Sequence, residues 1–262
     1  FAARLAIRLI HGPEGVQGGG YDSYLHIADN VIQGQGYCLV PGEGCAIRPP
    51  LYPSLLVPLL LTGGLFPSLV VVQAAFGALL AWVAFVIGCR LFDTPSGIGA
   101  AVMTAASPYA LVHDTALQET VVVNLLIGVA ACLLVVFADR RRLATLALAG
   151  LVLGLAILTT TRVALVAPAA TVWLLIGRVD TLRRRLAWCA RLALPLTLLA
   201  LLAPIEVLAR ISSVILLVVF ATVNAALLRI KLRHDANEAG LFCVPAWVPA
   251  AGLMFSLLPV AW

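Results

Sequence analysis

Two acidic and two basic side chains are the residues most suited to group-transfer chemistry: Asp22, Glu119, Arg48 and Arg162. A carboxylate that is ionised at neutral pH can accept a proton from an incoming hydroxyl or amine. An arginine can donate two parallel hydrogen bonds to a phosphate. These residue types therefore suit proton transfer and phosphate binding, provided that the fold brings them together.

Asp22 lies in the segment GYDSYLHIADN, residues 20–30, just before a run with helical periodicity. Apolar residues recur from Tyr24 to Val31 at the i, i+3, i+4, i+7 spacing of a short amphipathic helix. Asp22 could therefore be an N-cap, whose side-chain oxygen accepts a backbone N–H. It could equally be a general base or a metal ligand, and the periodicity leaves both interpretations open.

Glu119 lies in HDTALQET, between two apolar blocks and at the start of the second. The helix dipole favours a carboxylate there, but an ionisable group at a membrane boundary is also a functional candidate. His113 and Asp114 lie one to two turns away and are candidate substrate-binding residues. Together with Asp22 they could hold a divalent metal, although the spacing matches no dedicated metal motif, so the metal ligands stay unknown.

Arg48 in IRPPLYP and Arg162 in LTTTR are isolated cations between apolar blocks. Each could bind a phosphate, or its side chain could simply extend to a membrane interface. Tyr52 follows Arg48 closely and joins the candidate substrate-binding residues. The prolines between them would rigidify the chain at this point.

The elements that must position these residues are membrane helices. Of the 262 residues, 62% are hydrophobic and 11% are charged, whereas soluble domains carry about 25% charged residues. Apolar blocks of about 17–25 residues can cross a bilayer as helices. The predicted fold class is all-α: a multi-span transmembrane helical bundle with a long outer first loop that carries a short amphipathic interfacial helix.

We predict a single transmembrane domain over 1–262. Residues 1–10 end a first span, residues 11–50 form an outer loop, and residues 51–262 hold about eight further spans, after a short interfacial or re-entrant piece at 52–64. The predicted spans are 69–89, 97–112, 120–138, 143–160, 163–177, 187–206, 212–230 and 241–261.

Charge predicts the orientation of these spans, because cytoplasmic loops carry an excess of Lys and Arg. One side of the predicted bundle holds 12 of the 17 basic residues, and the other holds seven of the 12 acidic residues. The basic side should be cytoplasmic and the candidate site should face outward, in the cell (inner or plasma) membrane. The net charge of +5 is explained in this way, without nucleic acid.

Two further features concern packing and redox state. Cys38 and Cys45 share the predicted outer loop and could form a disulfide in an oxidising compartment. GLVLG at Gly150–Gly154 has the small-xxx-small spacing that lets helices approach closely. Motifs of soluble nucleotide or hydrolase chemistry, such as Walker A and G-x-S-x-G, are missing from the sequence.

Five segments, read in order, form a recognisable series: YDSYLHIADNVIQGQGY, RPPLYPSLLVPLL, VVVQAAFGALLAWVAFVIGCRLF, GIGAAVMTAASPYALVHDTALQET and GLVLGLAILTTTR. This series resembles the polytopic C-superfamily glycosyltransferases, nearest to the bacterial family 39 type. That type includes protein mannosyltransferases and the aminoarabinose transferases of lipid A. The resemblance covers roughly residues 1–175.

The resemblance implies inverting transfer of a sugar from a polyprenyl-phosphate donor to a lipid, protein or cell-wall acceptor on the outer membrane face. It matches the general base to Asp22 and a second acidic residue, which orients the acceptor or binds a metal, to Glu119. It matches basic partners of the lipid phosphate to Arg48 and Arg162. It makes no cofactor certain, and a divalent metal stays an option.

The sequence departs from the family pattern after about residue 200, where APIEVLARI is a degenerate echo of a family motif. We expect a chain truncated at both ends, since it also begins with Phe1. Two alternatives stay open: a transporter or flippase for a lipid-linked substrate, and an inactive helical scaffold. The sequence identifies neither the sugar nor the acceptor.

Overall fold

The computed structural model describes residues 1–12, 23–40, 48–62, 65–114, 116–176 and 182–201, all within one compact unit, Phe1–Leu208. Throughout these residues the regular structure is helical, as predicted, and no strand occurs. The predicted spans 212–230 and 241–261 lie outside the described residues. The elements are α1 (Ala2–His11), α3 (Tyr24–Ile32), α4 (Leu51–Leu61), α5 (Leu65–Leu91), α6 (Thr94–Ala106), α7 (Pro108–His113), α8 (Thr120–Arg140), α9 (Leu143–Thr159), the 3-10 helix η1 (Thr161–Leu165), α10 (Val166–Ile176) and α11 (Leu182–Ala200).

Two of the described helices, α5 and α8, are long and apolar enough to cross a membrane. Their 27 and 21 residues reach the length that a hydrocarbon core requires. Large apolar side chains also cover the outside of the bundle, including Trp82 and Met103, which are 61% and 77% exposed. Such a surface is stable in lipid and costly in water.

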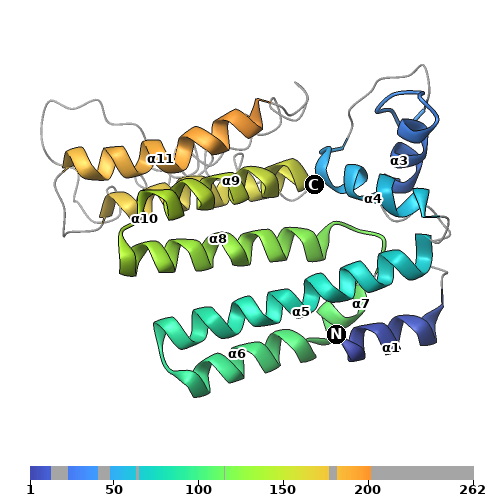
Figure 1. Cartoon of the computed structure of the whole chain (residues 1–262), viewed down its shortest axis with the longest axis horizontal. Coiled ribbons are helices and arrows are strands. Elements are labelled where there is room, and N and C mark those ends of the chain that lie inside the picture. The colour runs from blue at the N-terminus through green and yellow to red at the C-terminus, as the bar shows by residue number, and fades with distance from the viewer. Residues whose placement is uncertain (13–22, 41–47, 63–64, 115, 177–181, 202–262) are drawn as a thin grey trace, which may run out of the picture. The chain divides into compact units, whose positions relative to one another are not determined.

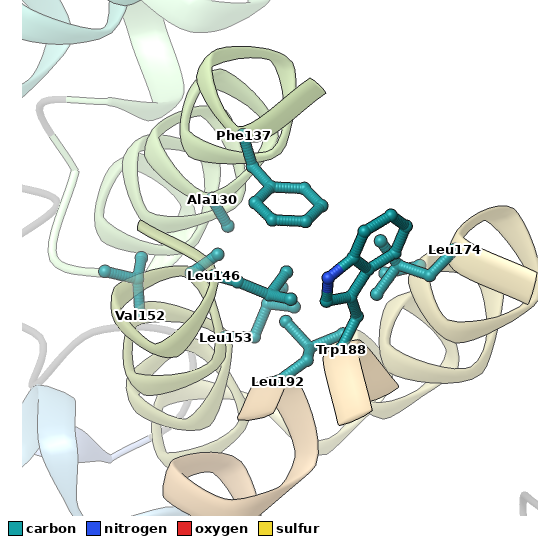
Figure 2. Close-up of a cluster of buried hydrophobic side chains, with 10 residues drawn as sticks. Ala130, Phe137, Leu146, Val152, Leu153, Leu174, Trp188 and Leu192 are labelled. Atoms are coloured by element: carbon teal, nitrogen blue, oxygen red, sulfur yellow. The ribbon is translucent and has the colours of Figure 1, made fainter. Parts of the chain in front are cut away.

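The long helices lie side by side (Figure 1). Helix α5 packs against α6 and α8, and α9 packs against α8 and α11. The pairs α5–α6 and α8–α9 are adjacent in the chain, whereas the α5–α8 and α9–α11 contacts join helices that are separated by other elements. The core between α8, α9, α10 and α11 is built around Phe137 and Trp188, whose rings meet edge to face at 5.3 Å (Figure 2).

Glycines set the closest helix contact in this core. A Cβ atom at Gly150 would overlap the carbonyl oxygen of Leu192 in α11, and one at Gly154 would lie 2.8 Å from Leu199. The GLVLG segment therefore packs backbone against backbone, which is the interpretation that the small-residue spacing favours.

Two predicted spans are divided in the structure: 163–177 begins in the 3-10 helix η1 before α10, and 97–112 is broken between two α-helices. The block 97–112 divides into α6 and α7 at Ser107. The residue before a proline avoids helical dihedrals, and Ser107 has φ −56° and ψ 118° before Pro108. Its hydroxyl then accepts the N–H of Ala110 at 3.5 Å and caps α7. The segment 97–112 is therefore two helices and not one, and its crossing of the membrane stays a prediction.

Candidate functional site

A cavity of about 350 Å³ opens beside the first turns of α8 and brings two predicted site residues together, Glu119 and Arg162. They are 43 positions apart in the sequence: Glu119 immediately precedes α8, and Arg162 lies just after α9. The rest of the lining is mixed polar and apolar. It consists of Tyr109, Thr120, Val123, Asn124, Ile127, Thr160, Val163 and Val166.

Glu119 occupies the N-cap position of α8, and its side chain makes no capping hydrogen bond. Arg162 lies in η1, which follows the extended residue Thr160 (φ −154°). Neither side chain forms a hydrogen bond or ion pair within the part of the chain that the structure describes. A negative and a positive group therefore line one cavity and are both available to a ligand.

The segment before Glu119 is held by a series of polar contacts. The Gln118 amide lies 2.9 Å from Nδ1 of His113 and donates to the His113 carbonyl at 3.0 Å. Gln73 in α5 donates to the Gln118 carbonyl at 3.3 Å and to the Tyr52 hydroxyl at 2.8 Å. His113 also stacks on Tyr109, with ring centroids 4.1 Å apart. His113 and Tyr52 thus lie behind the cavity wall, and neither lines the cavity.

Asp114 faces the protein interior. Its Oδ2 accepts hydrogen bonds from Arg4 Nη2 at 2.9 Å and Nε at 3.1 Å, and both side chains are 1% exposed. Burial raises the pKa of the Asp114 carboxyl, and the Arg4 guanidinium opposes that shift. Asp114 is therefore already neutralised by a protein partner.

The suggested metal ligands do not converge among the described residues. No group of three or more His, Cys, Asp or Glu side chains there is arranged to hold a metal ion. Asp114 is paired with Arg4, and Glu119 lines the cavity without His113. Asp22, the fourth suggested ligand, lies outside the described residues.

Arg48 does not line the cavity. It is half-buried and stands just before α4, where its backbone is held by Tyr37. The Tyr37 hydroxyl donates to the carbonyls of Arg48 and Pro49, at 2.9 and 3.0 Å. Burial raises the pKa of this hydroxyl, so Tyr37 remains a donor at neutral pH.

Asp22 itself lies outside the described residues. The predicted helix follows it as α3, Tyr24–Ile32, but the N-cap position belongs to Ser23 (φ 57°), whose side chain makes no capping bond. The apolar face of α3 packs on α4, with the rings of Tyr24 and Tyr52 4.9 Å apart. This face therefore contacts protein, and the position of α3 at a membrane surface stays a prediction.

Of the two cysteines in the predicted outer loop, only Cys38 is among the described residues. Cys38 is buried and disulfide-bonded. Its partner is none of Cys89, Cys132 and Cys189, which are free. Cys45 lies outside the described residues, so the Cys38–Cys45 pairing stays a prediction.

Basic residues gather at the end of the bundle remote from the cavity. Arg90 at the end of α5 donates to Asp139 near the end of α8 at 3.1 Å. Arg141, in the following turn, lies 5.0 Å from the ring of Trp188. These residues occupy the C-terminal end of α8, whereas the cavity lies at its N-terminal end.

Sequence reasoning missed Arg4, Gln73, Tyr109 and Asn124. Asn124 lies four residues after Thr120 and shares its face of α8, so its place beside the start of this helix could have been found from helical spacing. Arg4 and Gln73 gave a weaker signal, a polar residue within an apolar block. Their partners lie far away in the sequence and could not be found from spacing.

Comparison with known proteins gives one match. A model of the family described as dolichyl-phosphate-mannose-protein mannosyltransferase matches residues 48–205. No curated protein and no solved structure matches the chain. The matched segment includes Glu119, Arg162 and every helix that lines the cavity.

Proposed function

The chain belongs to the dolichyl-phosphate-mannose-protein mannosyltransferase family, whose members are membrane glycosyltransferases, and from this we propose that it transfers a sugar from a lipid-phosphate donor inside the Glu119–Arg162 cavity. The observation that carries the proposal is this pair of opposite charges in one cavity, neither of which has an ion-pair partner among the described residues. A polyprenyl-phosphate sugar is the donor class, and membrane lipid surrounds the protein. The acceptor is a lipid, protein or cell-wall hydroxyl or amine.

Transfer would proceed by direct displacement at the anomeric carbon. The bond from that carbon to the phosphate oxygen breaks, and its electron pair leaves on the lipid phosphate. A new bond forms from the acceptor oxygen or nitrogen to the opposite face of the same carbon, so configuration inverts. The acceptor proton passes to the Asp22 carboxylate, which acts as general base.

Arg162 has the chemistry to stabilise the leaving phosphate, because its fork matches two phosphate oxygens. The N-terminus of α8 adds unpaired N–H groups and a positive partial charge beside the same cavity. Glu119 would accept a hydrogen bond from the acceptor and orient it. Arg48 is the second candidate for the lipid phosphate. It stands just before α4 and does not line the cavity.

Two observations support an outward-facing site. The cavity lies at the end of α8 opposite the arginine-rich turn, and cytoplasmic segments are the ones enriched in arginine. Cys38, in the segment predicted to be the outer loop, is disulfide-bonded, and disulfides persist in oxidising compartments.

Reconstituted protein tests the proposal directly. Vesicles holding the purified chain are supplied with polyprenyl-phosphate mannose, glucose or aminoarabinose and with an acceptor mixture, and release of polyprenyl phosphate is followed with sugar transfer. We expect release from at least one donor, with inverted product. Absence of release from every donor, by correctly folded protein, would overturn the proposal, and donor movement between leaflets without bond cleavage would indicate a flippase.

A further inference from the structure

An ion pair buried in the bundle connects the first helix to the segment that carries Glu119. Arg4 in α1 and Asp114 after α7 are separated by 110 positions in the sequence and contact each other through two hydrogen bonds. Each side chain is 1% exposed. A charge so deeply buried is costly unless it is paired, which makes the pair a feature that needs an explanation.

The surrounding backbone is shaped to hold the guanidinium in one place. Arg4 Nη2 donates a third hydrogen bond to the carbonyl of Thr104 in α6, at 3.2 Å. On the other side lies Gly77 in α5, where a Cβ atom would overlap Arg4 Nε and lie 2.9 Å from Cδ and Cζ. Arg4 therefore contacts α5, α6 and Asp114 at once.

Asp114 is the start of the short path to the cavity. The chain from Asp114 to Glu119 is anchored at its other end by Gln118, which contacts His113 and Gln73. Ala116 and Leu117, between the anchors, are buried. Both anchors must hold if Glu119 is to keep its place beside Arg162.

We propose that the Arg4–Asp114 pair is a positioning device for Glu119, so that the first helix, which does not line the cavity, determines how well the acceptor is oriented there. The proposal rests on the proposed transferase function for its kinetic consequence. Its structural consequence, restricted opening of the backbone at residues 116–118, is measurable without any activity.

Removing either charge is a poor test, because the remaining buried charge alone could unfold the protein. Gly77→Ala is better, since the three heavy atoms nearest to the added methyl group all belong to Arg4 and the change removes no charge. Gly99→Ala in α6 is the matched control, because a Cβ atom there meets nothing within 4 Å. Alanine favours helices over glycine at both positions, so loss of helix stability does not separate the two variants.

Amide hydrogen exchange measures how often the backbone opens at residues 116–118. We expect Gly77→Ala to speed exchange at the hydrogen-bonded amides of Ala116 and Gln118 by about tenfold or more, and Gly99→Ala to leave it unchanged. Equal exchange in both variants and the parent would overturn the proposal, whether or not the protein transfers sugar.

A double-mutant cycle with Glu119→Gln reads the kinetic consequence. We expect Gly77→Ala to lower the kcat of transfer about tenfold in the parent chain and less than about twofold when Glu119→Gln is already present, because both changes act through one group. Equal losses in the two backgrounds would show that Gly77→Ala acts elsewhere and would contradict the positioning role. If the parent chain is inactive, that result counts against the transferase proposal. The hydrogen-exchange measurement alone then decides whether the Arg4–Asp114 pair holds the segment before Glu119.

Discussion

The candidate chemistry depends on two side chains of opposite charge that line the same cavity. Glu119 is the N-cap residue of α8, and Arg162 lies in the 3-10 helix η1. Neither forms an ion pair within the described residues. By contrast, Asp114 and Arg4 have the same charges but neutralise each other in the interior. A charge that already has an ion-pair partner in the protein interior serves the structure, whereas a charge that lines a cavity without such a partner among the described residues can bind a ligand.

Asp22→Asn should abolish transfer while leaving the fold intact. The amide keeps the size of the side chain but cannot take the acceptor proton, and a general base contributes about 10²–10⁴-fold to rate. Initial rates measured beside circular dichroism check this outcome. Retained turnover would exclude Asp22 as the base.

Arg48→Ala should raise the KM for the donor with a smaller effect on kcat, if Arg48 contributes to phosphate binding. A hydrogen bond to a charged group is worth about 1.5–3 kcal/mol, which corresponds to roughly a tenfold or greater change in affinity. Arg142→Ala, at the exposed turn after α8, is the control. An unchanged KM would assign Arg48 to interfacial anchoring instead.

The residues were partly predictable from sequence. Glu119 and Arg162 could be singled out because each is a lone charge at the end of an apolar block. Their common cavity could not, since it depends on how α8 and α9 pack. The ion pair of Asp114 could not be predicted for a similar reason, because its partner Arg4 lies 110 positions away.

At the scale of elements, helix boundaries follow local chemistry. Helix α6 begins where Asp93 accepts the N–H of Ser96 at 2.8 Å, and it ends before Pro108. Most predicted spans that fall on described residues overlap a helix, because long apolar blocks and polar breaks alternate clearly, although only α5 and α8 are long and apolar enough to cross a membrane. The break at Ser107 escaped notice because apolar residues continue on both sides of it, so hydropathy alone gave no signal.

Gly150→Ala should destabilise the packing of α9 on α11. The new methyl group overlaps the Leu192 carbonyl, which is backbone and cannot rotate away. Overpacking of this kind costs about 1–3 kcal/mol. Thermal unfolding in detergent, with Gly99→Ala as control, measures the loss, and equal stability of the two variants would contradict the close helix approach.

At the scale of the whole molecule, the described helices separate two kinds of surface. The N-terminal end of α8 holds the cavity, and the C-terminal end holds the basic turn with Arg90, Asp139 and Arg141. A transferase of a lipid-linked sugar needs this separation, because donor and acceptor must meet on one side of the membrane only.

Cysteine labelling in intact cells should report opposite faces for the two ends. In a chain whose native cysteines are serine, Gln33→Cys should react with a membrane-impermeant maleimide, and Arg142→Cys should react only after lysis. Both positions are exposed in the structure. Labelling of both from outside, or the reverse pattern, would contradict the outward orientation of the site.

The most direct test of the central claim is the donor dependence of transfer by Arg162→Ala and Glu119→Gln. Loss of the phosphate partner should raise the donor KM about tenfold or more in Arg162→Ala. Loss of the acceptor-orienting carboxylate should lower kcat in Glu119→Gln with little change in donor KM. Arg191→Ala, an exposed arginine of α11, should match the parent chain. Parent-like kinetics in both cavity variants would contradict the assignment of transfer to the Glu119–Arg162 cavity.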